Sequence, residues 1–282
     1  MRNLMASALG LLLLINAGTT VAGDVTELIR QVQQGDHRSD KNRARDSARH
    51  PVETLEFFGW QPEMTVVEIS PGTGWYTEFL APLTRPQGVL YAAGFALTAD
   101  DLPSYGKMVQ MMLVSKFEEA PEIYDHVVVT ELSVPQRVTP APPGSANMVL
   151  TFRNLHNWVK ADEAEEMLAV FYRTLKPGGV LGVVDHRAKP GTSVEAMARS
   201  GYVTEEYVID LVKAAGFAFE ASSPVNNNAA DSGDHPMGVW SLPPSLRGCR
   251  DIESATEKAA CEKPFRAIGE SDRMTLRFRK PA

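Results

Sequence analysis

Residues 65–75 read Thr-Val-Val-Glu-Ile-Ser-Pro-Gly-Thr-Gly-Trp. The first five residues have the β-branched and apolar character of a buried strand and are interrupted by one acid, Glu68. A glycine-rich turn follows, and residues 76–83 have the composition of a helix. Glycines let the backbone turn sharply and approach a ligand, while the free N–H groups of the next helix face the same crevice. The stretch therefore predicts a loop that binds a nucleoside cofactor; the alternative is a turn that needs its glycines only for packing.

The rest of the chain alternates between apolar strands and amphipathic helices. Helices are predicted at residues 51–59, 104–119, 161–175 and 204–215, and strands at 88–94, 126–132, 146–152 and 180–185. This alternation is typical of an α/β fold with a mostly parallel sheet and helices on both faces. Alternating apolar and basic residues at 274–279 predict a further strand at the edge of the sheet. Residues 226–268 depart from the alternation and are interpreted as a C-terminal insert.

Several motifs in the chain resemble those of a known family. Residues 68–74 resemble motif I of the class I S-adenosyl-L-methionine (SAM)-dependent methyltransferases, an acid followed by spaced glycines at a strand end. Leu175-Lys176-Pro177-Gly178-Gly179 resembles the turn before the fifth strand of that fold. Phe-Arg-Asn-Leu-His-Asn-Trp at 152–158, with residues 184–188, 234–244 and 269–274, looks like a family of exported bacterial proteins classed as predicted methyltransferases. The resemblance implies a Rossmann-like class I methyltransferase fold with a seven-stranded sheet, and SAM as the cofactor.

The resemblance also implies which residues hold the cofactor, namely Glu68, Ser70, Pro71, Gly72 and Gly74. Ser70 stands where the family has its first glycine, and its hydroxyl is expected to narrow or polarise the pocket.

One departure from the family concerns the ribose of the cofactor. The family usually ends its second strand with an acid that binds both ribose hydroxyls, but here that strand ends Ala-Ala-Gly-Phe at 92–95. The nearest acids are Asp100 and Asp101. The loss of this contact should weaken cofactor binding unless Glu68 or a later acid compensates, and Glu131 at the end of the third strand is also assigned to the cofactor site.

Polar residues follow two of the predicted central strands. Asn154, His156 and Asn157 come directly after a buried strand, where a parallel α/β sheet forms its ligand crevice. Methyl transfer needs a nucleophile in line with the methyl group and often a base for its proton, so His156 is the candidate base and Asn154 an orienting amide. Asp185 and His186 end the next strand and could form an acid–base relay or bind a substrate cation. The alternative is that these groups cap helices and turns.

A third histidine lies in a loop rich in Asn, Asp and Gly. The composition around Asp231, Asp234 and His235 predicts a turn. Together with His156 and His186, these groups could instead form the metal site of a metal-assisted hydrolase. Because no His-x-x-x-His pair supports that hypothesis, we assign no metal ligand.

The N-terminus predicts export. Residues 1–22 combine Arg2, an apolar stretch and small residues near Ala22, as in a cleaved secretory signal peptide. This leaves residues 23–282 as a methyltransferase-like domain that is periplasmic or secreted and has no membrane partner after cleavage. The net charge of −7 and the lack of a basic patch with aromatic residues argue against nucleic acid as a partner. The expected partner is a small-molecule substrate.

Cys249 and Cys261 are the only cysteines in the chain. In an oxidising compartment an isolated pair predicts a disulfide, and two cysteines alone lack the ligands for a structural zinc site.

Taken together, these patterns favour a SAM-dependent methyltransferase that acts on a small molecule. SAM is made in the cytoplasm, so an exported enzyme would need a source of it. The alternative is a non-catalytic periplasmic ligand-binding protein that retains the methyltransferase fold.

Overall fold

A computed structural model describes residues 17–97 and 104–282. The helices are α1 (Ala17–Gln33), α2 (Asp40–Arg43), α3 (Asp46–Arg49), α4 (Pro51–Phe58), α5 (Thr77–Thr84), α6 (Ser104–Glu119), α7 (Pro121–Tyr124), α8 (Leu155–Ala161), α9 (Ala164–Thr174), α10 (Val194–Ser200), α11 (Glu205–Ala214) and α12 (Ala255–Ile268). The strands are β1 (Thr65–Ile69), β2 (Val89–Gly94), β3 (Val128–Glu131), β4 (Ala146–Phe152), β5 (Leu175–His186), β6 (Ala218–Ser223) and β7 (Arg273–Arg279). Two short 3-10 helices, η1 (Gly238–Ser241) and η2 (Arg247–Cys249), lie between β6 and α12.

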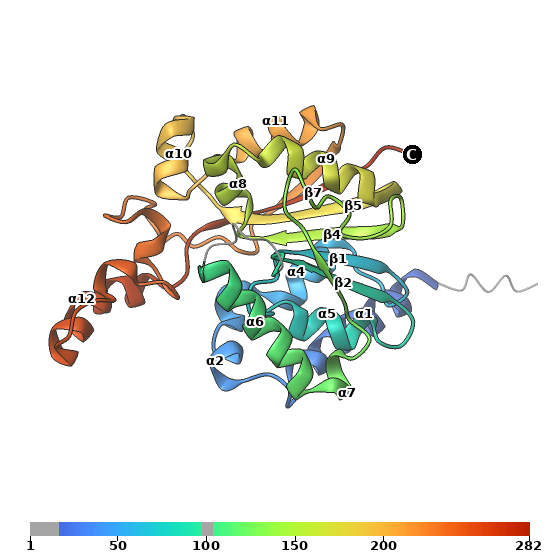
Figure 1. The fold of residues 1–282 in the computed structure, drawn as a ribbon, viewed down its shortest axis with the longest axis horizontal. Coiled ribbons are helices and arrows are strands. Elements are labelled where there is room, and N and C mark those ends of the chain that lie inside the picture. Colours follow the sequence, from blue (N-terminus) through green and yellow to red (C-terminus); the bar gives the residue numbers. More distant parts are fainter. Residues whose placement is uncertain (1–16, 98–103) are drawn as a thin grey trace, which may run out of the picture.

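The seven strands form one sheet in the order β3-β2-β1-β4-β5-β7-β6. Strands β1 to β5 pair in parallel, and β7 runs antiparallel to both β5 and β6. Helices cover both faces of this sheet, with α8, α9 and α11 on one side and α1, α4, α5 and α6 on the other (Figure 1). The predicted mostly parallel, seven-stranded α/β architecture is therefore confirmed.

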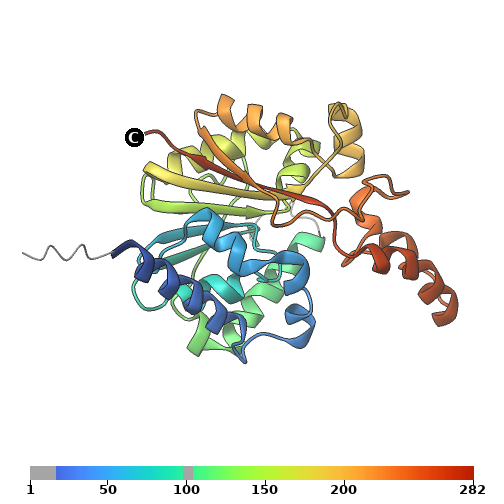
Figure 2. The ribbon, with the colours of Figure 1, turned by 180° about the vertical axis from the view of Figure 1, so that it is seen from behind.

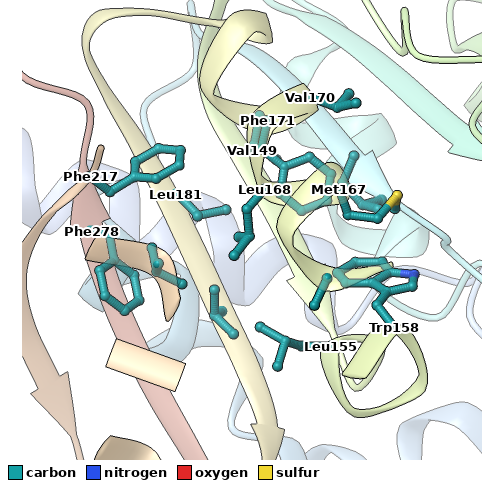
Figure 3. Close-up of a cluster of buried hydrophobic side chains, with 14 of the residues drawn as sticks. Val149, Leu155, Trp158, Met167, Leu168, Val170, Phe171, Leu181, Phe217 and Phe278 are labelled. Carbon is teal, nitrogen blue, oxygen red and sulfur yellow. The ribbon is translucent and has the colours of Figure 1, made fainter. Parts of the chain in front are cut away.

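Each face of the sheet buries an apolar core. Between the sheet and helices α8 and α9, Trp158 and Phe171 pack at a ring-centroid distance of 5.5 Å, close to Leu181 and Phe278 of the strands (Figure 3). These side chains explain why the strands read as apolar runs, since a central parallel strand is covered on both faces.

Helix α4 lies unusually close to the sheet on the opposite face. Pro51 occupies its first turn and Gly59 ends it with a left-handed φ of 76°, as the sequence predicted. A Cβ atom added at Gly182 of β5 would lie 2.6 Å from Leu150 and 2.9 Å from the Phe58 ring. Only glycine at this position lets α4 pack at this distance.

The structure corrects three predictions from the sequence. Strand β7 is not an edge strand, because the unpredicted β6 pairs along its outer side. Residues 176–179 do not form a separate turn but belong to β5, whose pairing with β4 is irregular there. The helix predicted at 161–175 begins only at Ala164, after Asp162 has ended α8 in a left-handed conformation. Each error concerns an element boundary or a strand neighbour, which depends on packing partners distant in the chain.

Some predictions fall on parts of the chain that are not described. Residues 1–16 of the predicted signal segment lie outside the described residues, as do Asp100 and Asp101. The predicted cleavage position near Ala22 falls within α1. Across residues 17–97 and 104–282, none of the helices combines the length and the apolar character needed to span a bilayer.

The predicted insert at 226–268 stands out from the sheet on the side where the parallel strands end (Figures 1 and 2). Cys249 of η2 and Cys261 of α12 form a disulfide with their Cα atoms 5.8 Å apart. The predicted pairing is therefore confirmed, and it joins α12 to the part of the insert that precedes it.

Because the disulfide closes a short loop, we expect a local gain in stability. The bridged residues are 12 positions apart. Reduction should lower the free energy of unfolding by about 2 to 3 kcal/mol, since a free chain regains loop entropy in the unfolded state. Urea unfolding with and without dithiothreitol measures the effect. The double variant Cys249→Ala/Cys261→Ala should be less stable than the untreated wild type, and dithiothreitol should not change its stability. Two alkylated thiols in the untreated protein would contradict the bridge.

Candidate functional site

The loop after β1 turns through backbone conformations that glycine normally provides. Ser70, Gly72 and Gly74 have φ values of 48°, 62° and 80°. The Ser70 N–H donates to Ala93 O at 2.8 Å, which holds the loop against the end of β2. Ser70 therefore adopts the left-handed conformation expected of the glycine it replaces, at the cost of some backbone strain.

The two glycines of the loop have different surroundings. A Cβ atom added at Gly72 would meet no protein atom within 4 Å, so its backbone is bare on that side. A Cβ atom added at Gly74 would lie 2.9 Å from Leu113 Cδ1 of α6. Gly72 thus leaves room for a ligand, whereas Gly74 permits close packing of a helix. The packing interpretation applies to Gly74, and cofactor binding at Gly72 stays a prediction.

Glu68 lies beneath the loop rather than in front of it. Its carboxylate is 1% exposed, and Oε2 accepts a hydrogen bond from Thr77 Oγ1 at 2.6 Å. Burial raises the pKa of Glu68 to about 7, against the smaller opposing effects of Thr77 and Lys116. Glu68 therefore joins β1 to the first turn of α5 and does not line the adjacent cavity.

A cavity of about 450 Å³ opens at the carboxyl ends of β1, β4 and β5. Its lining joins the loop after β1, the loop after β4, the end of β5 and the C-terminal insert. The lining residues are Ser70, Pro71, Gly72, Phe95, Tyr105, Val109, Phe152, Arg153, Asn154, His156, Asn157, His186, Val239, Trp240, Leu242, Pro243, Pro244, Ser245 and Arg250. Six predicted site residues therefore share one cavity: Ser70, Pro71, Gly72, Asn154, His156 and His186.

Asp185 organises the two histidines. This fully buried carboxylate accepts from His156 Nδ1 at 2.8 Å and from the backbone N–H of His156 at 3.0 Å. It also accepts from the backbone N–H of His186 at 2.7 Å. Because an ionised carboxylate can only accept hydrogen bonds, His156 carries its proton on Nδ1 and keeps Nε2 as a free acceptor. This arrangement is that of a general base held in one tautomer by a buried acid.

His186 is the neighbour of this pair. Its ring lies 4.9 Å from the His156 ring, and its Nδ1 is 2.5 Å from Ser271 Oγ. Burial, followed by His156 and Arg153, lowers the pKa of His186 well below its usual value. A neutral His186 beside His156 leaves His156 as the site for an incoming proton.

Asn154 bridges two strands instead of capping α8. Its Nδ2 donates to Ile69 O at 3.0 Å and to Thr151 Oγ1 at 3.1 Å. The side chain thus ties the end of β1 to the end of β4, and it forms no side-chain cap at the start of α8. Its amide holds the loop that carries His156, and its predicted role in orienting the reacting groups stays a prediction.

Glu131 does not lie in the cavity. It ends β3 opposite Gly94, and its Oε2 accepts from Arg137 Nε at 2.8 Å. At the end of β2, where the family has its ribose-binding acid, Gln110 of α6 accepts from the Phe95 N–H at 3.0 Å. A Cβ atom at Gly94 would overlap Gln110 Oε1 at 2.1 Å, so the glycine makes room for this amide. The sequence offered no signal for Gln110, because the contact joins two separate elements.

The three histidines proposed for a metal site do not converge. His235 Nε2 lies 2.7 Å from Asp231 Oδ1, which also accepts from the Tyr202 hydroxyl, and His235 borders a different pocket. Within the described part of the chain, the group that could hold a cation is His156, Asp185 and His186, with ligand atoms within 4.8 Å of one another. Both Asp185 oxygens there already accept hydrogen bonds from histidine N–H groups.

Comparison with known proteins assigns the fold. No family model and no curated protein sequence matches the chain. Among solved structures, a SAM-dependent methyltransferase from Aquifex aeolicus is 18% identical with a TM-score of 0.50, over 71% of this chain and 93% of that one. The chain has the class I methyltransferase fold.

Two further structures show the range of proteins with similar folds. The [4+2]-cyclase SpnF is 17% identical with a TM-score of 0.58, over 94% of this chain and 96% of that one. Phosphoethanolamine N-methyltransferase 2 from Haemonchus contortus, solved with phosphomonomethylethanolamine and S-adenosylhomocysteine, is 13% identical with a TM-score of 0.53. That match covers 90% of this chain and 61% of the Haemonchus chain. Similarity at this level describes the fold, and the activity has to be argued from the site.

The raised pKa of Glu68 predicts a pH-dependent stability. Since its pKa is about 7 in the folded protein and 4.5 in the free residue, the folded state holds the proton more tightly. The protonated Glu68 therefore contributes its full stabilisation below pH 4.5, and this stabilisation is lost as the pH rises through about 7. Glu68→Gln resembles the protonated acid, so its stability relative to wild type should rise by about 2 to 3 kcal/mol between roughly pH 5 and pH 8.

Urea unfolding across this pH range provides the measurement. Glu53→Gln, which alters an exposed acid of α4, serves as the control and should follow the wild-type curve. Parallel curves for Glu68→Gln and wild type would contradict the buried, protonated Glu68.

Proposed function

We propose that the protein is a SAM-dependent methyltransferase that acts on a small molecule. The observation that supports this proposal is the shared cavity: the glycine loop after β1 and the His156–Asp185 pair face the same space at the carboxyl ends of the strands. Its volume of about 450 Å³ lies in the range of small-molecule sites. Its C-terminal wall, which includes Trp240, Pro243 and Pro244, comes from the insert.

The residues present fit the cofactor. Gly72 offers a bare backbone to the cavity, as a loop that passes close to a ligand requires. Pro71 and Ser70 line the same wall, and the start of α5 follows. When bound, SAM supplies an electrophilic methyl group. Ser70, Pro71 and Gly72 would hold its methionine part.

His156 is the group suited to move a proton. Its Nε2 takes the proton of the methyl acceptor, and buried Asp185 stabilises the resulting imidazolium through Nδ1. Asn154 fixes the loop on which His156 lies. Trp240, whose ring lies 6.1 Å from that of His156, contributes to the wall that excludes water.

Two observations favour the second candidate, a non-catalytic ligand-binding protein. Ser70 replaces a loop glycine, and the end of β2 carries Gly94 and Phe95 instead of an acid. Calorimetric titration with SAM and S-adenosylhomocysteine separates the candidates. Roughly micromolar binding supports the enzyme, and no binding at about millimolar ligand supports the alternative.

Export is part of this proposal. The signal-like residues 1–22 support a periplasmic or secreted protein. The intact mass of the protein recovered from the periplasm of an expressing bacterium tests this directly, because cleavage near Ala22 removes the first 22 residues.

Gly72→Ala should weaken the binding of S-adenosylhomocysteine by about tenfold or more, since the methyl group enters the space that the cofactor needs. Gly178→Ala is a matched control. Gly178 also has a left-handed φ, 75°, and an added Cβ there would meet no atom within 4 Å, but it lies outside the cavity. Calorimetry on both variants is the measurement. An equal affinity for the two variants would remove Gly72 from the cofactor site.

His156→Gln should lower kcat by about a hundredfold, because proton transfer by a positioned side chain contributes on this scale. His235→Gln is the control, since His235 forms a similar buried pair with Asp231 outside the cavity. Turnover is followed with methyl-labelled SAM and a panel of small acceptors. Equal turnover in the two variants would exclude His156 as the base.

A further inference from the structure

Four arginines gather around one carboxylate beside the cavity. Arg45 Nε lies 2.7 Å from Glu270 Oε1, Arg49 Nε lies 3.1 Å from Oε2, and Arg273 Nη1 lies 3.4 Å from Oε2. Burial raises the pKa of Glu270, but Arg49, Arg153 and the other arginines outweigh it and hold that pKa well below the usual range. Asp185 also acts on Arg153, so four arginines share two buried carboxylates and the positive charge is in excess.

Arg153 is the member of this group that reaches the cavity. It is half-buried and lines the cavity, directly after β4. Its left-handed φ of 61° is rare for a residue with a side chain and places it off the strand direction. Across the described residues, its guanidinium has no hydrogen-bond acceptor, unlike the other three arginines, which each bind Glu270 or a backbone oxygen.

Two other arginines of this group have buried donors without acceptors. Nη2 of Arg49 and Nη2 of Arg45 are buried and have no hydrogen-bond partner. Arg49 is 2% exposed, and after burial the charge of Arg153 is the strongest influence that lowers its pKa. The Trp75 ring, 4.5 Å from Arg49 Cζ, compensates Arg49 in part, but a ring face does not replace the hydrogen-bond acceptors that the buried Nη2 groups lack.

The cavity itself has the same imbalance. Its described lining includes two arginines, Arg153 and Arg250, and no carboxylate. SAM would not correct this, because its sulfonium and ammonium groups outweigh its one carboxylate and leave it a net cation. A second ligand that carries a negative charge would balance the arginines.

We propose that the cavity binds a small molecule through a carboxylate or phosphate group, which Arg153 holds in a bidentate contact with Arg49 behind it. The identification of this molecule as the methyl acceptor rests on the proposed methyltransferase function. The planar guanidinium fork matches both anions. Arg153 also lies close enough to influence His186, so the anionic group would anchor the acceptor beside the His156 base.

A purely structural role does not account for Arg153. Through Glu270, Arg45 and Arg49 at the two ends of α3 are tied to Arg273 at the start of β7, and this connection is complete without Arg153. Adding a fourth arginine to such a cluster is destabilising unless an anion accompanies it.

The test uses the full protein with inorganic phosphate as the probe, measured by calorimetry at low salt. Arg153→Gln should weaken phosphate binding by about tenfold or more, since a charge-assisted contact is lost. Arg153→Lys should restore part of the affinity by keeping the charge. The control is Arg266→Gln, which changes an exposed arginine of α12 paired only with Glu262. Circular dichroism establishes that each variant is folded.

Additional ligands identify the source of the anion. Phosphate that binds equally well with S-adenosylhomocysteine present supports an acceptor site. Competition by S-adenosylhomocysteine but not by 5′-methylthioadenosine, which lacks the carboxylate, would overturn it, because Arg153 would then hold the cofactor. Equal phosphate binding by wild type and Arg153→Gln, or none by wild type, would also overturn it. Arg153-dependent phosphate binding without S-adenosylhomocysteine binding would support the anion site while refuting the methyltransferase function.

Discussion

The parallel pairing of β1 with β4 places the groups of the candidate site. Its register runs from Val66 opposite Met148 to Ile69 opposite Thr151, so the two strands end at the same level. The loops that follow leave the sheet next to each other, and Asn154 joins them by donating to Ile69 O. Strand β5 adds Asp185 and His186 at the same edge through its own parallel pairing with β4. The cavity exists because a parallel sheet gathers its loops at the carboxyl ends of its strands.

Three buried carboxylates near this edge are held in different ways. Glu68 accepts from the Thr77 hydroxyl, and burial raises its pKa. Asp185 accepts three N–H hydrogen bonds, and Glu270 is surrounded by arginines. A buried carboxylate is stabilised in its charged form only by hydrogen-bond donors and cations. These surroundings therefore suit a neutral acid at Glu68, a hydrogen-bond acceptor at Asp185 and an anion at Glu270.

The insert gives the cavity its outer wall. Residues from Val239 to Arg250 line the side opposite the glycine loop, and the disulfide ties this segment to α12. The site is therefore assembled from a sheet edge typical of the fold and from a segment that departs from simple strand–helix alternation. In the proposed function, this segment would be the main determinant of which acceptor enters.

The sequence by itself determined the architecture, the disulfide and the edge of the sheet that carries the site. These rest on local signals: apolar runs for β1 and β4, the amphipathic pattern and cap of α11, and polar residues directly after strands. Only the tertiary structure decided that β7 is internal, that Glu131 lies outside the cavity, and that Gly72 and Gly74 differ in their surroundings. It also revealed the charge imbalance around Arg153, because that cluster joins side chains from three distant segments. Hydrophobic periodicity is a local property of the sequence, whereas close packing and the balance of buried charges depend on which segments meet in space.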